Sequence, residues 1–182
     1  MKPIRRSSMS LLLAAVLATA VTAQTNPPTA EQVLTGATQT AKAQQKNVLI
    51  HFGASWCSWC KHLDAMLESA EVGKLFRDNY VIAHLTIQES KDKVALENPG
   101  AQEMVDGAGA KGAGVPVYIF FDSDGQRIAT SLAMPDGRNI GHPATPEEIQ
   151  AFAGLLEKTA PRMTAGERQQ VTDYLSKQKY GN

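Results

Sequence analysis

Residues 48–61 read Val48-Leu49-Ile50-His51-Phe52-Gly53-Ala54-Ser55-Trp56-Cys57-Ser58-Trp59-Cys60-Lys61. The first five residues form a short, almost wholly apolar run rich in branched side chains, which is typical of a buried central strand. Residues 53–56 then form a turn at the C-terminal end of this strand, and we expect a helix from about Cys57 towards Ser69. The two cysteines therefore stand one helical turn apart, at the point where a helix begins.

This position suits redox chemistry. Unpaired backbone N–H groups converge at the start of a helix and favour a thiolate over a thiol. A free cysteine has a pKa of about 8.5, whereas cysteines of Cys-x-x-Cys motifs at helix N-termini reach roughly 3.5–7.5. Cys57 is thus placed as the nucleophile that attacks a disulfide, and Cys60 as the thiol that resolves the mixed disulfide. The pattern predicts a thiol–disulfide oxidoreductase, with the direction of electron flow left open.

The cysteine pair could also be a structural disulfide, a haem-attachment motif or part of a metal site. A structural disulfide closing so small a loop would stabilise the fold by only about 2 kcal/mol. Haem attachment requires His directly after the second cysteine, where this chain has Lys61. A metal site would need further ligands, and His51, His62 and His84 lack the usual paired spacing. We expect no metal and no cofactor; the alternatives are a copper-handling module that uses the two cysteines and a histidine, and a subunit with vestigial cysteines.

The elements on either side indicate an α/β fold. Helices are expected at 30–45 (closed by Asn47), 72–78, 97–105, 145–159 and 164–179, and strands at 80–87, 117–121 and 126–131. Asp122-Ser123-Asp124-Gly125 is a strong hairpin turn between the last two strands, and Thr145-Pro146-Glu147-Glu148 is a well-formed helix start. Early strands joined by helices favour parallel pairing, and the late hairpin adds antiparallel pairing.

Residues 52–61 resemble the active-site segment of the thioredoxin superfamily, in which aromatic-x-Ala-x-Trp-Cys-x-x-Cys-Lys recurs. Gly114-Val115-Pro116, followed by an apolar strand, looks like the cis-proline segment of that family. The resemblance covers roughly residues 30–160. It implies a thioredoxin-like fold: a central mixed sheet of about four strands, helices on both faces and an extra C-terminal helix. The long helix directly before the Val48 strand is closer to exported thioredoxin-like proteins, and to the C-terminal domain of the membrane thiol–disulfide interchange reductase, than to cytosolic thioredoxin.

The resemblance also implies site residues. Pro116 would be cis and lie against the cysteines, although an isolated X-Pro bond is more commonly trans. The backbone of Val115 would bind an extended substrate segment, and Trp56 would shape the surface beside Cys57. His51 stands where thioredoxin has a buried Asp that aids proton transfer, so it is either a proton relay or a half-buried strand residue with a hydrogen-bonded ring. Ser58-Trp59 differs from the Gly-Pro of thioredoxin, so the redox potential cannot be transferred.

The N-terminus has the pattern of a secretory signal. Lys2, Arg5 and Arg6 precede an uncharged apolar stretch, and small residues follow. We predict a signal peptide over 1–23, cleaved after Ala23 with Ala20 as the alternative, and a periplasmic or secreted mature chain. The apolar segment is shorter than the roughly 20 residues that span a bilayer, which disfavours an uncleaved anchor. No cysteine lies near the cleavage point, which disfavours a lipoprotein.

The mature chain, 24–182, would form one thioredoxin-like domain, with a disordered start at 24–29, a core at about 30–160 and a C-terminal helical extension at 161–182. Loss of the three cations leaves a formal charge of −3, too mild to indicate nucleic acid as a partner. We expect as partners protein thiols or disulfides and a redox partner protein, with a membrane protein as one candidate. We expect no stable membrane insertion of the mature chain.

Some weaker signals are discounted. Residues 107–112 match a Gly-x-Gly-x-x-Gly pattern, but they precede a strand instead of following one, so a flexible loop is expected. His142 lies in a polar loop and is expected to be exposed. Lys61 and His62 are expected to be solvated surface residues.

Overall fold

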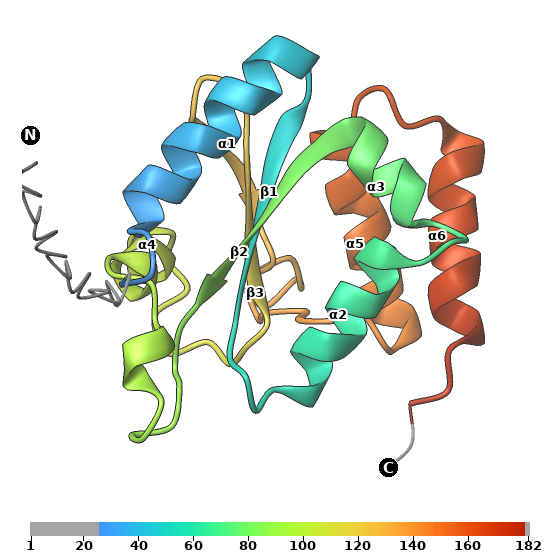
Figure 1. Cartoon of the computed structure of the whole chain (residues 1–182). Coiled ribbons are helices and arrows are strands. Elements are labelled where there is room, and N and C mark those ends of the chain that lie inside the picture. Colours follow the sequence, from blue (N-terminus) through green and yellow to red (C-terminus); the bar gives the residue numbers. More distant parts are fainter. Residues whose placement is uncertain (1–25, 181–182) are drawn as a thin grey trace, which may run out of the picture.

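A computed structural model of the chain describes residues 26–180, and its centre is a four-stranded sheet with the order β2-β1-β3-β4 (Figure 1). The strands are β1 (Asn47–Gly53), β2 (Tyr80–Thr86), β3 (Val117–Phe121) and β4 (Arg127–Thr130). β1 pairs with β2 in parallel and with β3 antiparallel, and β4 is antiparallel to β3. The predicted α/β fold with a mixed sheet of about four strands is confirmed.

Helices precede, connect and follow the strands. They are α1 (Ala30–Gln44), α2 (Ser58–Glu68), α3 (Gly73–Asn79), the short 3-10 helix η1 (Val94–Leu96), α4 (Ala101–Gly107), α5 (Pro146–Thr159) and α6 (Ala165–Lys177). Thr29, Thr145 and Thr164 are the N-caps of α1, α5 and α6, and each forms a reciprocal capping box with a Gln or Glu three residues later. The helix start predicted at Thr145 is therefore confirmed.

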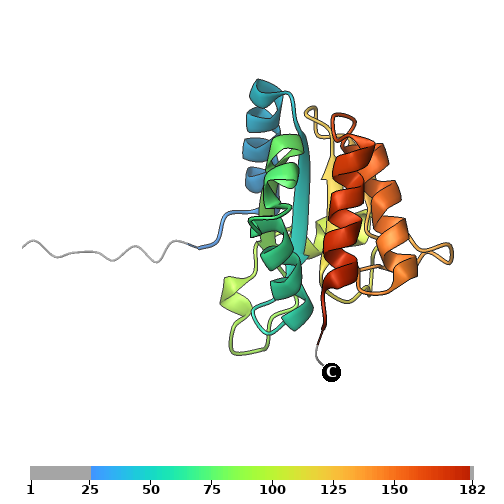
Figure 2. The ribbon, with the colours of Figure 1, turned by 90° about the vertical axis from the view of Figure 1, so that its right-hand side faces the viewer.

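Helices cover both faces of the sheet. α2, α3, α5 and α6 pack on one face, and α1 and α4 pack on the other (Figure 1); the first group faces the viewer in Figure 2. Successive residues of β1 and β3 point alternately into the two cores. Because both faces are covered, all five residues of β3 are buried.

The first helix ends one residue earlier than predicted, and Gln45 closes it instead of Asn47. Gln45, with a left-handed φ of 54°, ends α1 and donates its backbone N–H to the last turn. Asn47, expected to close the helix, is instead the first residue of β1, and its side-chain amide donates to the carbonyl oxygen of Thr159 at 2.7 Å. This asparagine thus holds the start of the central strand against the end of α5.

The helix expected at 97–105 begins later. Asn98 lies before the helix and binds other segments through its side chain. Its Oδ1 accepts the backbone N–H of Thr86 at 2.7 Å, and its Nδ2 donates to the carbonyl of Pro28 at 2.8 Å. Gly100 follows with a φ of 81°, outside helical geometry. α4 therefore starts at Ala101, because the residues before it fasten the end of β2.

The predicted signal peptide, 1–23, its cleavage point and residues 24–25 lie outside the described residues. Among residues 26–180, no helix has both the length and the apolar character that crossing a bilayer requires.

Candidate functional site

Cys57 and Cys60 form a disulfide at the start of α2, and their Cα atoms lie 5.3 Å apart. Both residues are only 3% exposed. Cys57 has extended backbone geometry and is the N-cap of α2, and its Sγ accepts the backbone N–H of Cys60 at 3.0 Å. After reduction, this N–H and the positive end of the helix would stabilise negative charge on the Cys57 sulfur. The structure thus places Cys57 at the start of a helix, as the sequence predicted.

The turn before the cysteines is fastened to the loop that follows β2. The Trp56 indole Nε1 donates to the Gln88 carbonyl at 2.8 Å, and its side chain remains 57% exposed beside Cys57. Ser55 donates its backbone N–H and its hydroxyl to the two carboxylate oxygens of Glu89, at 2.5 and 2.9 Å. These bonds, that of the backbone N–H first, lower the pKa of Glu89. Sequence reasoning missed this glutamate, because it lies in the least regular part of the chain.

Val115 and Pro116 lie on the other side of the cysteines. The peptide bond between them is cis, Pro116 is buried, and the Val115 carbonyl oxygen lies 3.6 Å from Cys57 Sγ. Asn139 holds this segment: its Nδ2 donates to the carbonyl oxygens of Gly114 and Pro116 at 2.8 and 3.0 Å. The position of Asn139 in a long loop gave no sequence signal for this role.

An open groove of about 390 Å³ runs beside this segment and is called here the cis-proline groove. It is lined by Trp59, Gly114, Val115, Pro116, Asn139, Ile140, Gly141, His142, Ala144 and Glu148. The groove and the exposed indole of Trp56 flank Cys57.

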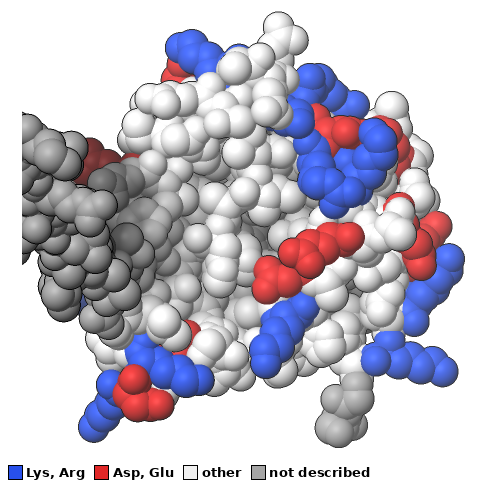
Figure 3. Space-filling model, viewed as in Figure 1, with Lys and Arg blue, Asp and Glu red and all other residues white. Residues whose placement is uncertain are grey.

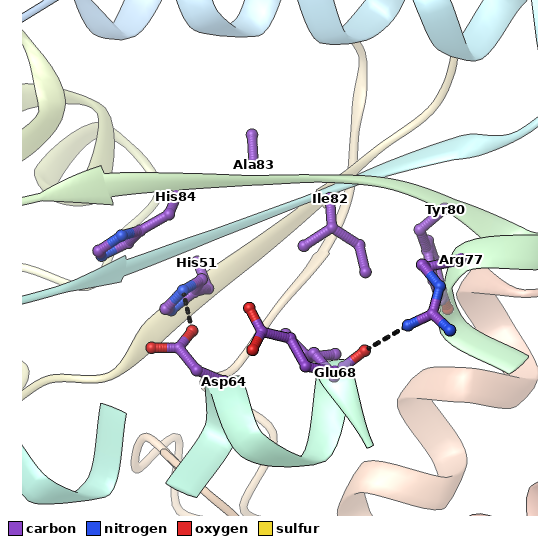
Figure 4. A pocket seen from close by; sticks show the side chains of 9 residues that line it. His51, Asp64, Glu68, Arg77, Tyr80, Ile82, Ala83 and His84 are labelled. Carbon is purple, nitrogen blue, oxygen red and sulfur yellow. Dashed lines mark hydrogen bonds and ion pairs between the residues drawn. The ribbon is translucent and has the colours of Figure 1, made fainter. Parts of the chain in front are cut away.

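His51 lies on β1, is 2% exposed and donates from Nε2 to Asp64 Oδ1 at 2.8 Å (Figure 4). Its ring stacks on that of His84 from β2, with centroids 4.3 Å apart. The Nδ1 atom of the His51 ring is buried and has no hydrogen-bond partner among residues 26–180. His51 is thus fully buried, and its ring is hydrogen-bonded.

A pocket of about 410 Å³ connects this histidine pair to the surface. It is lined by His51, Asp64, Leu67, Glu68, Arg77, Tyr80, Ile82, Ala83 and His84. Figure 3 shows the same face of the molecule as Figure 1: charged side chains of both signs are interspersed around an uncharged, hollowed middle, which acidic side chains border.

The pKa values of two residues that line this pocket, His84 and Asp64, are shifted by their surroundings. Burial lowers the pKa of His84, and the neighbouring His51 lowers it further, whereas Asp64 acts in the opposite direction. For Asp64, partial burial raises the pKa, but the hydrogen bond from His51 and the charges of both imidazoles outweigh it and leave a net decrease. Asp64 is therefore a carboxylate whose charge favours the protonated form of His84.

Gly53 lies between this pair and the disulfide. A Cβ atom at Gly53 would lie 3.0 Å from Cys60 Sγ and 3.3 Å from His84 Nε2. Both atoms therefore approach the same backbone position, which only a glycine leaves open. This places a histidine nitrogen on the Cys60 side of the pair.

The prediction for His142 is wrong. This histidine is 5% exposed, and its Nε2 and the Tyr180 hydroxyl form a hydrogen bond of 2.5 Å. The reason is the segment after α6, which packs over the loop that carries His142. Lys61 and His62 are exposed as expected.

Residues 107–114 form the end of α4 and a loop with positive φ at Gly109 and Gly112, which leads to the cis-proline and β3. Within residues 26–180, no group of three or more His, Cys, Asp or Glu side chains is arranged to hold a metal ion. The copper-handling alternative therefore receives no support.

A family model described as thioredoxin-like matches residues 29–123, which include β1, β2, β3 and both cysteines. No curated protein matches the chain by sequence.

Several solved structures are similar. A disulphide isomerase from Xylella fastidiosa Temecula1 is 18% identical with a TM-score of 0.49, over 89% of this chain and 98% of that one. A structure described as DsbH oxidoreductase is 19% identical with a TM-score of 0.44, over 82% and 95%. The oxidised C-terminal domain of Neisseria meningitidis DsbD is 23% identical with a TM-score of 0.40, over 57% and 84%.

Proposed function

This chain belongs to the thioredoxin-like family, and from that premise we propose that it is a thiol–disulfide oxidoreductase acting through Cys57 and Cys60. The observation that carries the proposal is the position of Cys57: its sulfur accepts a backbone N–H at the start of α2 and lies beside the cis-proline groove. A sulfur there is both activated as a thiolate and within reach of a bound disulfide.

The two cysteine thiols of the chain supply both electrons of the reaction. The Cys57 thiolate attacks one sulfur of a substrate disulfide, forms a mixed disulfide and releases the other sulfur as a thiolate that takes a proton. Cys60, once deprotonated, attacks Cys57 Sγ and releases the second substrate thiol. The substrate gains two electrons, and the chain is left with the Cys57–Cys60 disulfide that the structure contains. The same steps in reverse oxidise a dithiol.

Substrate binding is assigned to three residues around Cys57. The Val115 backbone would pair with an extended substrate segment as a strand does, next to the cis bond to Pro116. Trp56 would form the opposite border, because its indole is fixed by Gln88 yet exposed.

We assign the removal of the Cys60 proton to the two stacked histidines, His51 and His84. Cys60 must lose a proton before it attacks, and His84 Nε2 lies across Gly53 from its sulfur. His51 would act as the relay, because its buried Nδ1 has no hydrogen-bond partner among residues 26–180 and its Nε2 contacts the Asp64 carboxylate. The pocket around them would pass the proton to solvent.

The place of action is also a proposal. The pattern of residues 1–23 supports export with cleavage near Ala23, which would place residues 24–182 in the periplasm or outside the cell. The substrates would then be disulfides of exported proteins. Continued turnover there needs a redox partner protein that restores the dithiol or the disulfide, and a membrane protein is one candidate.

Reduction of insulin by dithiothreitol tests the activity. The wild-type chain should accelerate insulin precipitation, and Cys57→Ser should lower the rate at least 100-fold, because the attacking thiolate is absent. Cys60→Ser should instead accumulate a mixed disulfide through Cys57, which non-reducing electrophoresis detects. Full turnover by Cys57→Ser would contradict the proposal. A redox titration of the pair would then give the direction of electron flow.

A further inference from the structure

Four aromatic rings form a cluster beside the cysteines, which is called here the tail cluster. They belong to Trp59 and His62 on α2, His142 before α5, and Tyr180 after α6, and each ring lies within 6.1 Å of the other three, centroid to centroid. Trp59 stands between Cys57 and Cys60 in the sequence. The tail of the chain is therefore in direct contact with the redox-active segment.

The path of the chain explains this contact. α6 ends at Lys177. The backbone N–H of Gln178 donates to the Leu175 carbonyl, and the chain is extended at Gln178. The tail then runs to the end of the molecule where α2 begins, as Figures 1 and 2 both show. A small cavity of about 40 Å³ lies beneath it, and its lining includes Tyr180, Gln178, His62 and Tyr174. The tail is thus packed against α2.

The hydrogen bond between Tyr180 and His142 persists at neutral pH. Burial lowers the pKa of His142 to about 4, and His62 contributes to the decrease. Burial also raises the pKa of Tyr180 to about 12. Both groups are therefore neutral in the ordinary working range, and the bond between them needs no charge.

Two members of the tail cluster also form a wall of the cis-proline groove. Trp59 and His142 line that groove on one side and contact Tyr180 on the other. Trp59 is 42% exposed, and its ring contacts that of Tyr180 at a centroid distance of 5.2 Å. Removal of Tyr180 would free this ring and expose the imidazole of His142.

The rest of the groove combines polar and apolar surface. The Asn139 amide is engaged by the carbonyls of Gly114 and Pro116, and Glu148 Oε2 accepts the N–H groups of Ala144 and Thr145 at 3.0 Å. These two side chains are thus held by the chain's own backbone. An apolar substrate side chain would pack on the apolar part of the groove, which is formed by Trp59, Val115, Pro116, Ile140 and Ala144.

We infer that Tyr180 is a specificity-determining residue that fixes Trp59 and His142 as one wall of the cis-proline groove, so that the groove selects extended protein segments with an apolar side chain next to the disulfide. This inference rests on the proposed function. Tyr180 acts through the two groove residues and does not touch the reacting sulfurs.

Two matched peptide disulfides test it, one with Leu and one with Ser next to the cysteine, each measured for kcat/KM with the reduced full chain. The wild-type chain should prefer the Leu peptide. Tyr180→Ala should lower the Leu-to-Ser ratio at least fivefold, mainly through a higher KM for the Leu peptide. Tyr180→Phe keeps the ring and should retain most of the ratio, and the neighbouring exposed Lys179→Ala should match the wild type.

A ratio within twofold of wild type in Tyr180→Ala would overturn the inference while leaving the proposed function intact. Absence of wild-type turnover on both peptides would instead contradict the proposed function, and the inference with it. If Tyr180→Ala does not fold, Tyr180→Leu keeps apolar bulk without the ring, and the same ratio decides.

Discussion

Two buried histidines near the cysteine pair, His51 and His142, are held in different ways. His51 donates to the carboxylate of Asp64 and stacks on a second histidine, whereas His142 is bonded to the neutral hydroxyl of Tyr180. Their exposed fractions are 2% and 5%. Burial is therefore nearly equal at the two sites, and the partner makes the difference.

This difference separates two roles. A carboxylate beside an imidazole stabilises its charged form, which a group that accepts and releases protons requires. A neutral partner in a buried site gives no such help, so His142 stays uncharged and serves as a wall of the groove. A histidine near the cysteines is thus not sufficient for proton transfer.

The largest effect is expected at His142 on the acid side. Its pKa is lowered from 6.5 to about 4, so the unfolded chain binds a proton that the folded chain refuses. Its contribution to stability is complete above about pH 6.5 and is lost as the pH falls towards 4. The loss amounts to about 3 kcal/mol of unfolding free energy.

Urea unfolding of the oxidised chain between pH 7 and pH 4 measures this loss. His142→Gln removes the titrating group, so its unfolding free energy should fall by about 3 kcal/mol less than that of wild type over this range. Glu148 and His62 act on His142 in opposite directions and remain in the variant. Parallel curves for the two proteins would show that His142 is not held neutral by burial.

A smaller effect is expected at Gly53, which separates His84 from Cys60. Gly53→Ala places a methyl group 3.0 Å from Cys60 Sγ and 3.3 Å from His84 Nε2, so one of them must move. Such overpacking should lower the unfolding free energy by about 2 kcal/mol. Thermal unfolding of the oxidised chain measures it.

Gly36→Ala is the matched control. Gly36 lies within α1, and a Cβ atom there would have no atom within 4 Å. The change should therefore raise stability by up to about 1 kcal/mol through helix propensity. Equal shifts in both variants would mean that the space at Gly53 is not limiting.

The sequence predicted what contiguous residues encode. The central strand, the turn and the helix start at Cys57 each follow from a short run of residue types, because local geometry fixes them. The segment around Pro116 was implied by the resemblance to the thioredoxin superfamily. The mixed sheet followed from the order of these runs.

Contacts between distant residues were not predictable in this way. His142 and Tyr180 are 38 positions apart, and nothing in the polar loop around His142 indicates that a tail will cover it. Asp64 is on the exposed side of a helix pattern, and its bond to His51 exists only once α2 has packed on β1. The role of a buried histidine depends on such partners, so the sequence left the role of His51 open.

The smallest effect is expected for Asp64→Asn, and this substitution distinguishes the roles of His51 and His142 most directly. Asp64→Asn keeps an oxygen that can accept from His51 but removes the negative charge, and so withdraws support for the imidazolium. Attack of Cys60 on a preformed mixed disulfide should be about fivefold slower at pH 7, equivalent to about 1 kcal/mol in the barrier. Stopped-flow fluorescence of Trp56 and Trp59 can follow this step.

The pH profile distinguishes this from a structural effect. The lowered pKa of Asp64 keeps it ionised well below neutrality, so the rate difference should persist from pH 8 to pH 5 and shrink only when the pH falls through that lowered pKa. The same step in His142→Gln should show no such pattern, since no carboxylate is bonded to that ring. If Asp64→Asn resolves the mixed disulfide as fast as wild type, His51 is a hydrogen-bonded core residue that takes no part in proton transfer. The bond to Asp64 would then matter for stability alone.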